Sequence, residues 1–187
     1  MILLFCGLSG AGKSTLAEKV KNKLAAENIF IEIIDGDEYR RKLFKDLGYS
    51  MEDRFENIRR LGLIANKFSQ HNIVTVVSAI NPYDSIRKEL VRSYKNVKVI
   101  HIDCDLETLV KRDTKGLYRR ALLPADHPDK LSNLTGVNDP FEIPENPDLY
   151  VNTHKSTPKE CTNEICAFII RSIVKEKYMY NTYAHVS

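Results

Sequence analysis

The sequence predicts an α/β protein in which helices flank both faces of a parallel, five-stranded sheet. Five short segments rich in Ile and Val are apolar on both faces, as buried parallel strands are. Amphipathic helical patterns lie between them, and this alternation is typical of a doubly wound sheet. The expected strands are residues 2–6, 29–34, 73–78, 97–102 and 149–152. The expected helices are residues 13–27, 38–46, 51–71, 84–94, 106–112 and 158–177.

The length and composition favour one domain that spans residues 1–187. A chain of this length can bury one α/β core but is short for two. No apolar run reaches the roughly 18 residues that cross a membrane, and no signal-peptide pattern opens the chain. A net charge of +3 does not indicate a nucleic-acid partner. The four cysteines lack metal-site spacing, which is typical of reduced thiols in a cytoplasmic protein.

Residues 7–15 read GLSGAGKST, and they lie between the first expected strand and the first expected helix. This is the pattern of a phosphate-binding loop, in which glycines aim backbone N–H groups at phosphate oxygens. Lys13 supplies a charge for the β- and γ-phosphates, and the Ser14 hydroxyl suits Mg²⁺. The positive end of the helix that follows also favours an anion. A chance match in a glycine-rich turn is the alternative, and the flanking strand and helix argue against it.

Two carboxylates follow the second expected strand. Asp35 and Asp37 are separated by a glycine, and Arg40 comes one helical turn later. In open α/β sheets, ligands bind beyond the carboxyl ends of the strands. These three side chains can therefore hold Mg²⁺, orient an acceptor hydroxyl and clamp an acceptor phosphate. A structural alternative, compatible with the first, makes Asp37 the acidic N-cap of the next helix.

The third expected helix places Arg54 and Asn57 on one face, three residues apart. Arg54 can offer two parallel N–H groups to a phosphate or a sulfate. A solvated basic helix face would show a similar pattern.

No regular period runs through residues 114–147, where five of the seven prolines lie. A structureless stretch of this length inside a compact domain is usually functional, and we expect a lid that excludes water from a transferring phosphoryl group. Its start carries Lys115, Arg119 and Arg120, and Arg112 precedes it. A solvated surface excursion is the alternative.

Together these motifs resemble the adenylylsulfate kinase family, from the phosphate loop to about residue 153. The segments that carry the resemblance are residues 7–15, Asp35-Gly36-Asp37 with Arg40, residues 46–50, Asp53-Arg54, residues 56–60, Asn81-Pro82-Tyr83, Arg112-Asp113, residues 115–118, Thr135-Gly136 and residues 144–147. Several of them are longer and rarer than a phosphate loop. Gluconate- or shikimate-type kinases would share the phosphate loop but are not expected to carry residues 56–60 or the segment 115–118.

The resemblance implies a P-loop kinase fold and transfer of the γ-phosphoryl group of ATP to the 3′-hydroxyl of adenylylsulfate, with Mg²⁺, in sulfate activation. It implies a catalytic role for Lys13, Asp35 and Asp37, and Mg²⁺ binding by Ser14 and Asp35. It implies that ATP is bound by Ser9, Gly10, Ala11, Gly12, Lys13, Ser14, Thr15 and Arg112. It implies that the acceptor is bound by Asp37, Arg40, Tyr49, Arg54, Asn57, Ile80, Lys115 and Leu134, with Tyr49 stacked on the base. Family members are commonly homodimers.

The chain departs from the family pattern on the side of the acceptor base. Ala79, Asn81 and Asp84 replace a Phe, a Ser and an Arg in the usual Ser-Phe-Ile-Ser-Pro-Tyr-Arg segment, and Leu134 replaces a Phe before Thr-Gly. The lid is also about five residues longer than usual. Loss of an aromatic platform forfeits ~1 kcal/mol or more of base stacking. Two alternatives therefore stay open: a related kinase for another nucleotide, such as cytidine diphosphoramidate in capsule biosynthesis, or a catalytically idle nucleotide-binding module.

Overall fold

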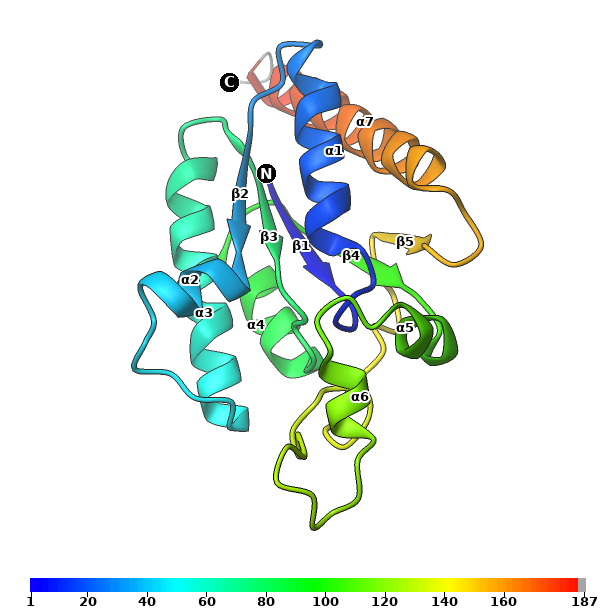
Figure 1. Cartoon of the computed structure of the whole chain (residues 1–187). Coiled ribbons are helices and arrows are strands. Elements are labelled where there is room, and N and C mark those ends of the chain that lie inside the picture. Colours follow the sequence, from blue (N-terminus) through cyan, green and yellow to red (C-terminus); the bar gives the residue numbers. More distant parts are fainter. Residues whose placement is uncertain (185–187) are drawn as a thin grey trace.

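The computed structural model describes residues 1–184 and contains the predicted parallel sheet (Figure 1). The strands lie in the order β2-β3-β1-β4-β5. All neighbouring strands pair in parallel. The single-domain prediction extends to residues 185–187, which lie outside the described residues. The strands are β1 (Ile2–Cys6), β2 (Ile31–Asp35), β3 (Val74–Ser78), β4 (Val97–Asp103) and β5 (Leu149–Asn152).

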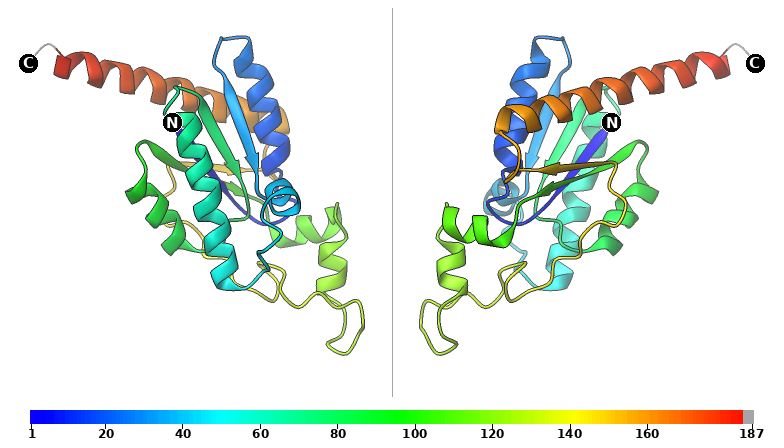
Figure 2. Two further views of the ribbon diagram at one scale, coloured as in Figure 1. Left: turned by 90° about the vertical axis from the view of Figure 1, so that its left-hand side faces the viewer. Right: turned by 90° about the vertical axis from the view of Figure 1, so that its right-hand side faces the viewer.

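Helices cover both faces of this sheet, as the sequence predicts. Alternate residues of β1 point to opposite faces. Leu3 and Phe5 join a hydrophobic core with α1 and α7, and Ile2 and Leu4 join a second core with α3 and α4. In both views of Figure 2 the C-terminal part of α7 extends beyond the rest of the molecule. The helices are α1 (Lys13–Ala25), α2 (Gly36–Lys42), α3 (Met51–Ser69), α4 (Asp84–Ser93), α5 (Leu106–Arg112), α6 (Leu117–Ala121) and α7 (Pro158–Ala184).

The bounds of α2 differ from the prediction, because the helix has another N-cap. The Asp35 carboxylate accepts hydrogen bonds from the backbone N–H groups of Asp37 and Glu38, so Asp35 is the N-cap and the helix begins at Gly36. The prediction of Asp37 as N-cap is therefore wrong. The helix ends at Lys42 rather than at residue 46. At the C-terminus, α7 continues to Ala184, past the predicted end at residue 177.

The segment 114–147 is not structureless throughout, because it contains the short helix α6. The Asp113 carboxylate accepts hydrogen bonds from the N–H groups of Tyr118 and Arg119 and so caps the start of this helix. The Lys130 ammonium donates to the carbonyl oxygens of Ala121 and Leu123 at its end. In Figure 1 this segment projects from the end of the sheet at which the phosphate loop lies. No helix in residues 1–184 is both long and apolar enough for a membrane span.

Candidate active site

The phosphate loop turns sharply between β1 and α1. Gly7 has a positive φ of 149°, and a Cβ atom there would collide with the carbonyl oxygen of Ile102 on β4. Only glycine therefore lets β1 lead into this loop without displacing β4. The loop ends at Gly12, the N-cap of α1, which makes no side-chain capping bond. The first N–H groups of α1 are thus not bound by a capping side chain. They lie at the N-terminal end of the helix, which attracts anions.

Lys13 is buried beneath this loop. Its ammonium group donates hydrogen bonds to the carbonyl oxygens of Gly7 and Leu8, each at 2.8 Å. Burial lowers the pKa of the Lys13 ammonium to about 8, while nearby Asp37 raises this pKa and Lys115 lowers it. The positive charge is therefore held by neutral carbonyls and is available to an incoming anion.

Three oxygen-bearing side chains meet beside the loop. The Ser14 hydroxyl donates to Asp35 Oδ2 at 2.6 Å and lies 3.1 Å from Ser78 Oγ. The other Asp35 oxygen caps α2, so the carboxylate has a fixed orientation. A hydroxyl and a carboxylate beside a phosphate site are the hard oxygen ligands that Mg²⁺ takes together with phosphate and water. Among the described residues no cluster of three or more His, Cys, Asp or Glu could hold a metal by itself.

A salt bridge links the start of the lid to α2. Lys115 Nζ lies 2.5 Å from Asp37 Oδ2, and both side chains are exposed. Both residues line the same cavity as the phosphate loop. It brings together one carboxylate and one ammonium group that the sequence assigns to the acceptor.

The opposite wall of the site contains two arginines and a tyrosine. The Arg40 guanidinium lies 5.0 Å from the centroid of the Tyr49 ring and donates to the Gly48 carbonyl at 2.6 Å. Arg54 lies 5.9 Å from the same centroid. The Tyr49 side chain is 60% exposed, so its ring keeps a surface on which a base can stack.

These groups line one cavity of about 970 Å³. This volume is at the upper end of the usual range for ligand sites and has room for two nucleotides' phosphate groups. Of the predicted site residues, the cavity is lined by Ser9, Gly10, Gly12, Lys13, Ser14, Thr15, Asp35, Asp37, Arg40, Tyr49, Arg54, Ile80, Lys115 and Leu134.

Three predicted site residues do not line this cavity. Ala11 is fully buried in the hydrophobic core. Asn57 is 4% exposed on α3, and its Oδ1 atom has no hydrogen-bond partner among the described residues. Arg112 is exposed at the end of α5. The ATP- and acceptor-binding roles of these residues stay predictions.

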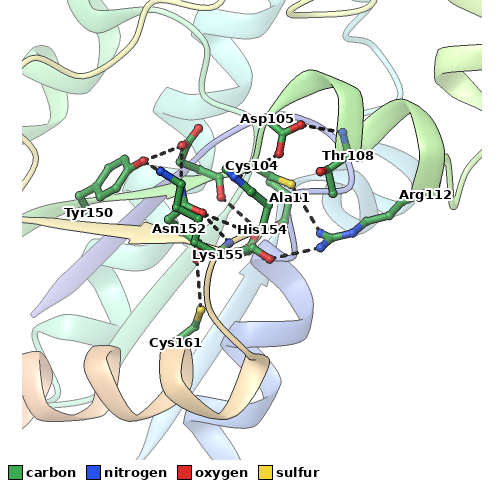
Figure 3. Close-up of polar contacts among 12 residues, drawn as sticks. Ala11, Cys104, Asp105, Thr108, Arg112, Tyr150, Asn152, His154, Lys155 and Cys161 are labelled. Atoms are coloured by element: carbon green, nitrogen blue, oxygen red, sulfur yellow. Dashed lines mark hydrogen bonds and ion pairs between the residues drawn. The ribbon is translucent and has the colours of Figure 1, made fainter.

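Arg112 belongs to a polar network behind the phosphate loop (Figure 3). It donates to the Thr153 carbonyl at 3.2 Å and lies 3.5 Å from Cys104 Sγ. The Thr153 hydroxyl lies 3.0 Å from the Ala11 carbonyl oxygen, so the loop after β5 is attached to the phosphate loop. His154 Nδ1 lies 3.0 Å from Asp105 Oδ2 in the same network. Arg112 is therefore linked to the phosphate loop through Thr153, outside the residues that line the cavity.

Several cationic and apolar residues of the cavity were not predicted from the sequence. Arg41 could have been found, because it follows Asp37 by four residues and lies on the same face of α2. The cavity holds seven Lys or Arg side chains and two carboxylates, so it favours a polyanionic ligand. The cations are Lys13, Arg40, Arg41, Lys45, Arg54, Lys115 and Arg120. Of these, Arg41, Lys45 and Arg120 are not among the predicted site residues. The other lining residues outside the prediction are Leu47, Ser78, Ala79, Thr114, Leu117, Leu131, Asn133 and Thr135.

Comparison with known proteins agrees with this site. The family model described as "Adenylylsulphate kinase" matches residues 1–152. The chain belongs to the adenylylsulfate kinase family. A probable adenylyl-sulfate kinase of Pseudomonas aeruginosa is 42% identical over 164 residues, which cover 88% of this chain and 74% of the relative. An adenylyl-sulfate kinase of Microcystis aeruginosa is 42% identical over 159 residues, which cover 85% of each chain. The family consists of kinases, which are phosphotransferases.

Solved structures of kinases share the fold of this chain. The adenylylsulfate kinase of Mycobacterium tuberculosis, solved in complex with AMPPNP and APS, matches with a TM-score of 0.82 and 32% identity, over 90% of this chain and 96% of that one. A gluconokinase of Sinorhizobium meliloti matches with a TM-score of 0.62 at 20% identity, over 95% of each chain. The second match shows the shared fold alone. Both agree with the predicted P-loop kinase fold.

Proposed function

We propose that this protein transfers the γ-phosphoryl group of ATP to the 3′-hydroxyl of adenylylsulfate and so forms 3′-phosphoadenylylsulfate. One observation carries the proposal: a single cavity joins a complete phosphate loop to a cationic acceptor wall. A protein that only bound ATP would have no need for Arg40 and Lys115 in the same cavity as the loop. Membership of the adenylylsulfate kinase family supports the choice of acceptor.

On the donor side, residues 9–15 bind the phosphates of ATP. The Lys13 ammonium leaves the carbonyls of Gly7 and Leu8 and turns to the γ-phosphate, which is the stronger acceptor because it is charged. Charge near the transferring group is the main contribution of a protein to phosphoryl transfer, which needs little covalent chemistry. Arg112 approaches the donor nucleotide from the far side of the loop.

Ser14 and Asp35 would hold Mg²⁺, because their oxygens already converge beside the phosphate loop. When bound, the ion neutralises charge on the β- and γ-phosphates. The carboxylate keeps its orientation through its second oxygen, which caps α2.

On the acceptor side, Asp37 orients the attacking hydroxyl and accepts its proton. Lys115 lies 2.5 Å from that carboxylate and stands next to the transferring group. Arg40, with the part of Arg54 that faces the cavity, attracts the phosphate and sulfate charges of the acceptor. The Tyr49 ring stacks on the base, and the lid segment 114–147 excludes water that would otherwise hydrolyse ATP.

A second acceptor is favoured by the apolar part of the cavity. The cavity is lined by several aliphatic side chains, among them Leu47, Leu131 and Leu134, and Tyr49 is the one aromatic ring in its lining. These aliphatic side chains would form the wall on which the base rests. With Leu134 in place of a phenylalanine, an adenine loses an aromatic stacking partner. A pyrimidine base is smaller and loses less stacking area. The alternative function is phosphorylation of cytidine diphosphoramidate by the same phosphate-side residues.

A steady-state assay of ADP release with ATP and Mg²⁺ tests both acceptors. We expect saturable turnover with adenylylsulfate that is absent without an acceptor and in the Lys13→Ala variant. Turnover with cytidine diphosphoramidate alone would reject the first proposal in favour of the second. No turnover with any nucleotide acceptor, with ATP still bound, would indicate an idle nucleotide-binding module.

We also propose a cytoplasmic location and a homodimeric state. The four cysteines are buried and free, as thiols are in a reducing compartment. Sedimentation of the purified protein measures the oligomeric state, and a monomer at all concentrations would contradict the second statement.

A further inference from the structure

The far limb of the lid, residues 131–139, is attached to α3 by one arginine. Arg54 is 7% exposed and makes contacts with two separate segments. Its Nε atom donates to the Tyr49 carbonyl at 3.0 Å, beside the start of α3. Its two terminal nitrogens reach the limb: Nη1 donates to Thr135 Oγ1 at 2.7 Å, and Nη2 donates to the Asn133 carbonyl at 2.8 Å.

The guanidinium is also paired with a carboxylate of the limb. Arg54 Nη2 lies 2.7 Å from Asp139 Oδ2, and the Asp139 side chain is 23% exposed. An arginine has five N–H groups, and these four contacts use four of them. In this arrangement the guanidinium can therefore give an acceptor anion one hydrogen bond. Most of its hydrogen bonds are made to the far limb of the lid.

The limb is internally ordered, so a tie at one point fixes all of it. The Asn138 side chain accepts from the Leu134 N–H at 2.7 Å and donates to the Leu131 carbonyl at 2.8 Å. The Gly136 N–H donates to the Asp139 carbonyl at 2.7 Å. These bonds connect Asp139 rigidly to Leu131 and Leu134, which line the apolar part of the cavity.

The limb also packs on the phosphate loop. Gly136 has a positive φ of 86°, and a Cβ atom there would lie 2.5 Å from Leu8 Cδ2. The limb thus lies between α3 and the phosphate loop, and the Arg54–Asp139 pair fixes its side toward α3.

We propose that Asp139 is a positioning residue for the acceptor. Through Arg54 it holds residues 131–139 in place, and with them the apolar wall on which the acceptor base rests. This inference rests on the proposed function. Loss of the carboxylate leaves the Arg54 charge buried without its counter-charge, which is strongly unfavourable for the closed arrangement. The limb then leaves α3, and the base loses its wall.

The test compares Asp139→Asn with Asp126→Asn, a control at an exposed lid aspartate for which the structure shows no side-chain bond. We expect Asp139→Asn to raise the KM of the acceptor about tenfold or more, with the KM of ATP and kcat changed less than about threefold. Asp126→Asn should match the parent protein. A merely structural residue would change these parameters together or would lower only the melting temperature.

Limited trypsin digestion gives a second readout that needs no acceptor. Cleavage after Arg119, Arg120 and Lys130 should be several-fold faster in Asp139→Asn than in Asp126→Asn, because the lid opens more often. Trypsin cleavage still tests whether the Arg54–Asp139 pair holds the limb if the parent protein phosphorylates neither acceptor. Failure of the proposed function can therefore be distinguished from failure of the positioning role of Asp139. If Asp139→Asn does not fold, Thr135→Val removes one contact of Arg54 and should shift both readouts the same way, by a smaller factor.

Two results would overturn the proposal. An unchanged acceptor KM and unchanged lid cleavage in Asp139→Asn would show that the Arg54–Asp139 pair does not hold residues 131–139 in place. A lower acceptor KM would show that Asp139 competes with the acceptor for Arg54 instead of positioning the wall.

Discussion

The state of Lys13 makes ATP capture dependent on pH in a way that can be calculated. The pKa of this ammonium is lowered to about 8 by burial, from an ordinary value of 10.5. With a pKa of 8, the group is about 90% protonated at pH 7 and about 10% protonated at pH 9. Since the charged form binds the γ-phosphate, kcat/KM for ATP should fall about tenfold between these two pH values.

We expect kcat to change little between pH 7 and pH 9. Bound phosphates raise the pKa of Lys13, so the ammonium stays charged in the enzyme–ATP complex. Lys13 also contributes to stability with a definite sign: between pH 8 and 10.5 the unfolded chain binds the proton that the folded chain has lost. Its contribution to the free energy of unfolding therefore rises with pH in that window in the absence of nucleotide.

Initial rates at limiting and saturating ATP, with saturating acceptor and Mg²⁺, measure both parameters from pH 6.5 to 9.5. Calorimetry at pH 8.5 in two buffers of different ionisation enthalpy then measures proton uptake on binding of ATP analogues. A profile of kcat/KM that stays flat to pH 9.5, without proton uptake, would refute the placement of Lys13 as a buried cation with a lowered pKa.

Three further perturbations address other parts of the site. Lys13→Ala should reduce kcat by at least about a hundredfold in the ADP-release assay, because it removes charge next to the transferring group; near-normal kcat would exclude that role. Tyr118→Phe removes the 2.7 Å bond from the phenol to the Ser9 carbonyl, and should lower the free energy of unfolding by about 1 kcal/mol in urea titration; no change would show that this bond does not stabilise the folded protein. Leu134→Phe should lower the KM of adenylylsulfate several-fold by restoring an aromatic partner for the base; a higher KM would show that the ring blocks the cavity.

The parts of the site that follow from sequence are those built by short segments. The phosphate loop is predictable because Gly7, Lys13 and Ser14 lie close together in the sequence, where a strand leads into a helix. Asp35 and Asp37 are predictable because carboxyl ends of parallel strands meet at one edge of the sheet. The capping role of Asp35 was missed because two aspartates two residues apart compete for the same N-cap, and only the geometry decides between them.

The lid could not be predicted in the same way, because its order depends on distant partners. The helix α6 has five residues, too few to form alone, and it depends on Asp113 and Lys130 at its two ends. The contacts of Arg54 with Thr135 and Asp139 join positions about 80 residues apart, and no local pattern reports them. The burial of Asn57 could not be predicted either, because a polar residue on a helix face does not show whether that face is covered.

Transfer of a phosphoryl group to the 3′-hydroxyl of adenylylsulfate is the reaction that we propose for this site. Its most direct test is a single turnover with enzyme in excess, ATP labelled in the γ-phosphoryl group, Mg²⁺, and adenylylsulfate and cytidine diphosphoramidate together. We predict that the label appears in 3′-phosphoadenylylsulfate, and that the Lys13→Ala protein gives none. Label found only in the cytidine product, or only in inorganic phosphate, would show that adenylylsulfate is not the acceptor.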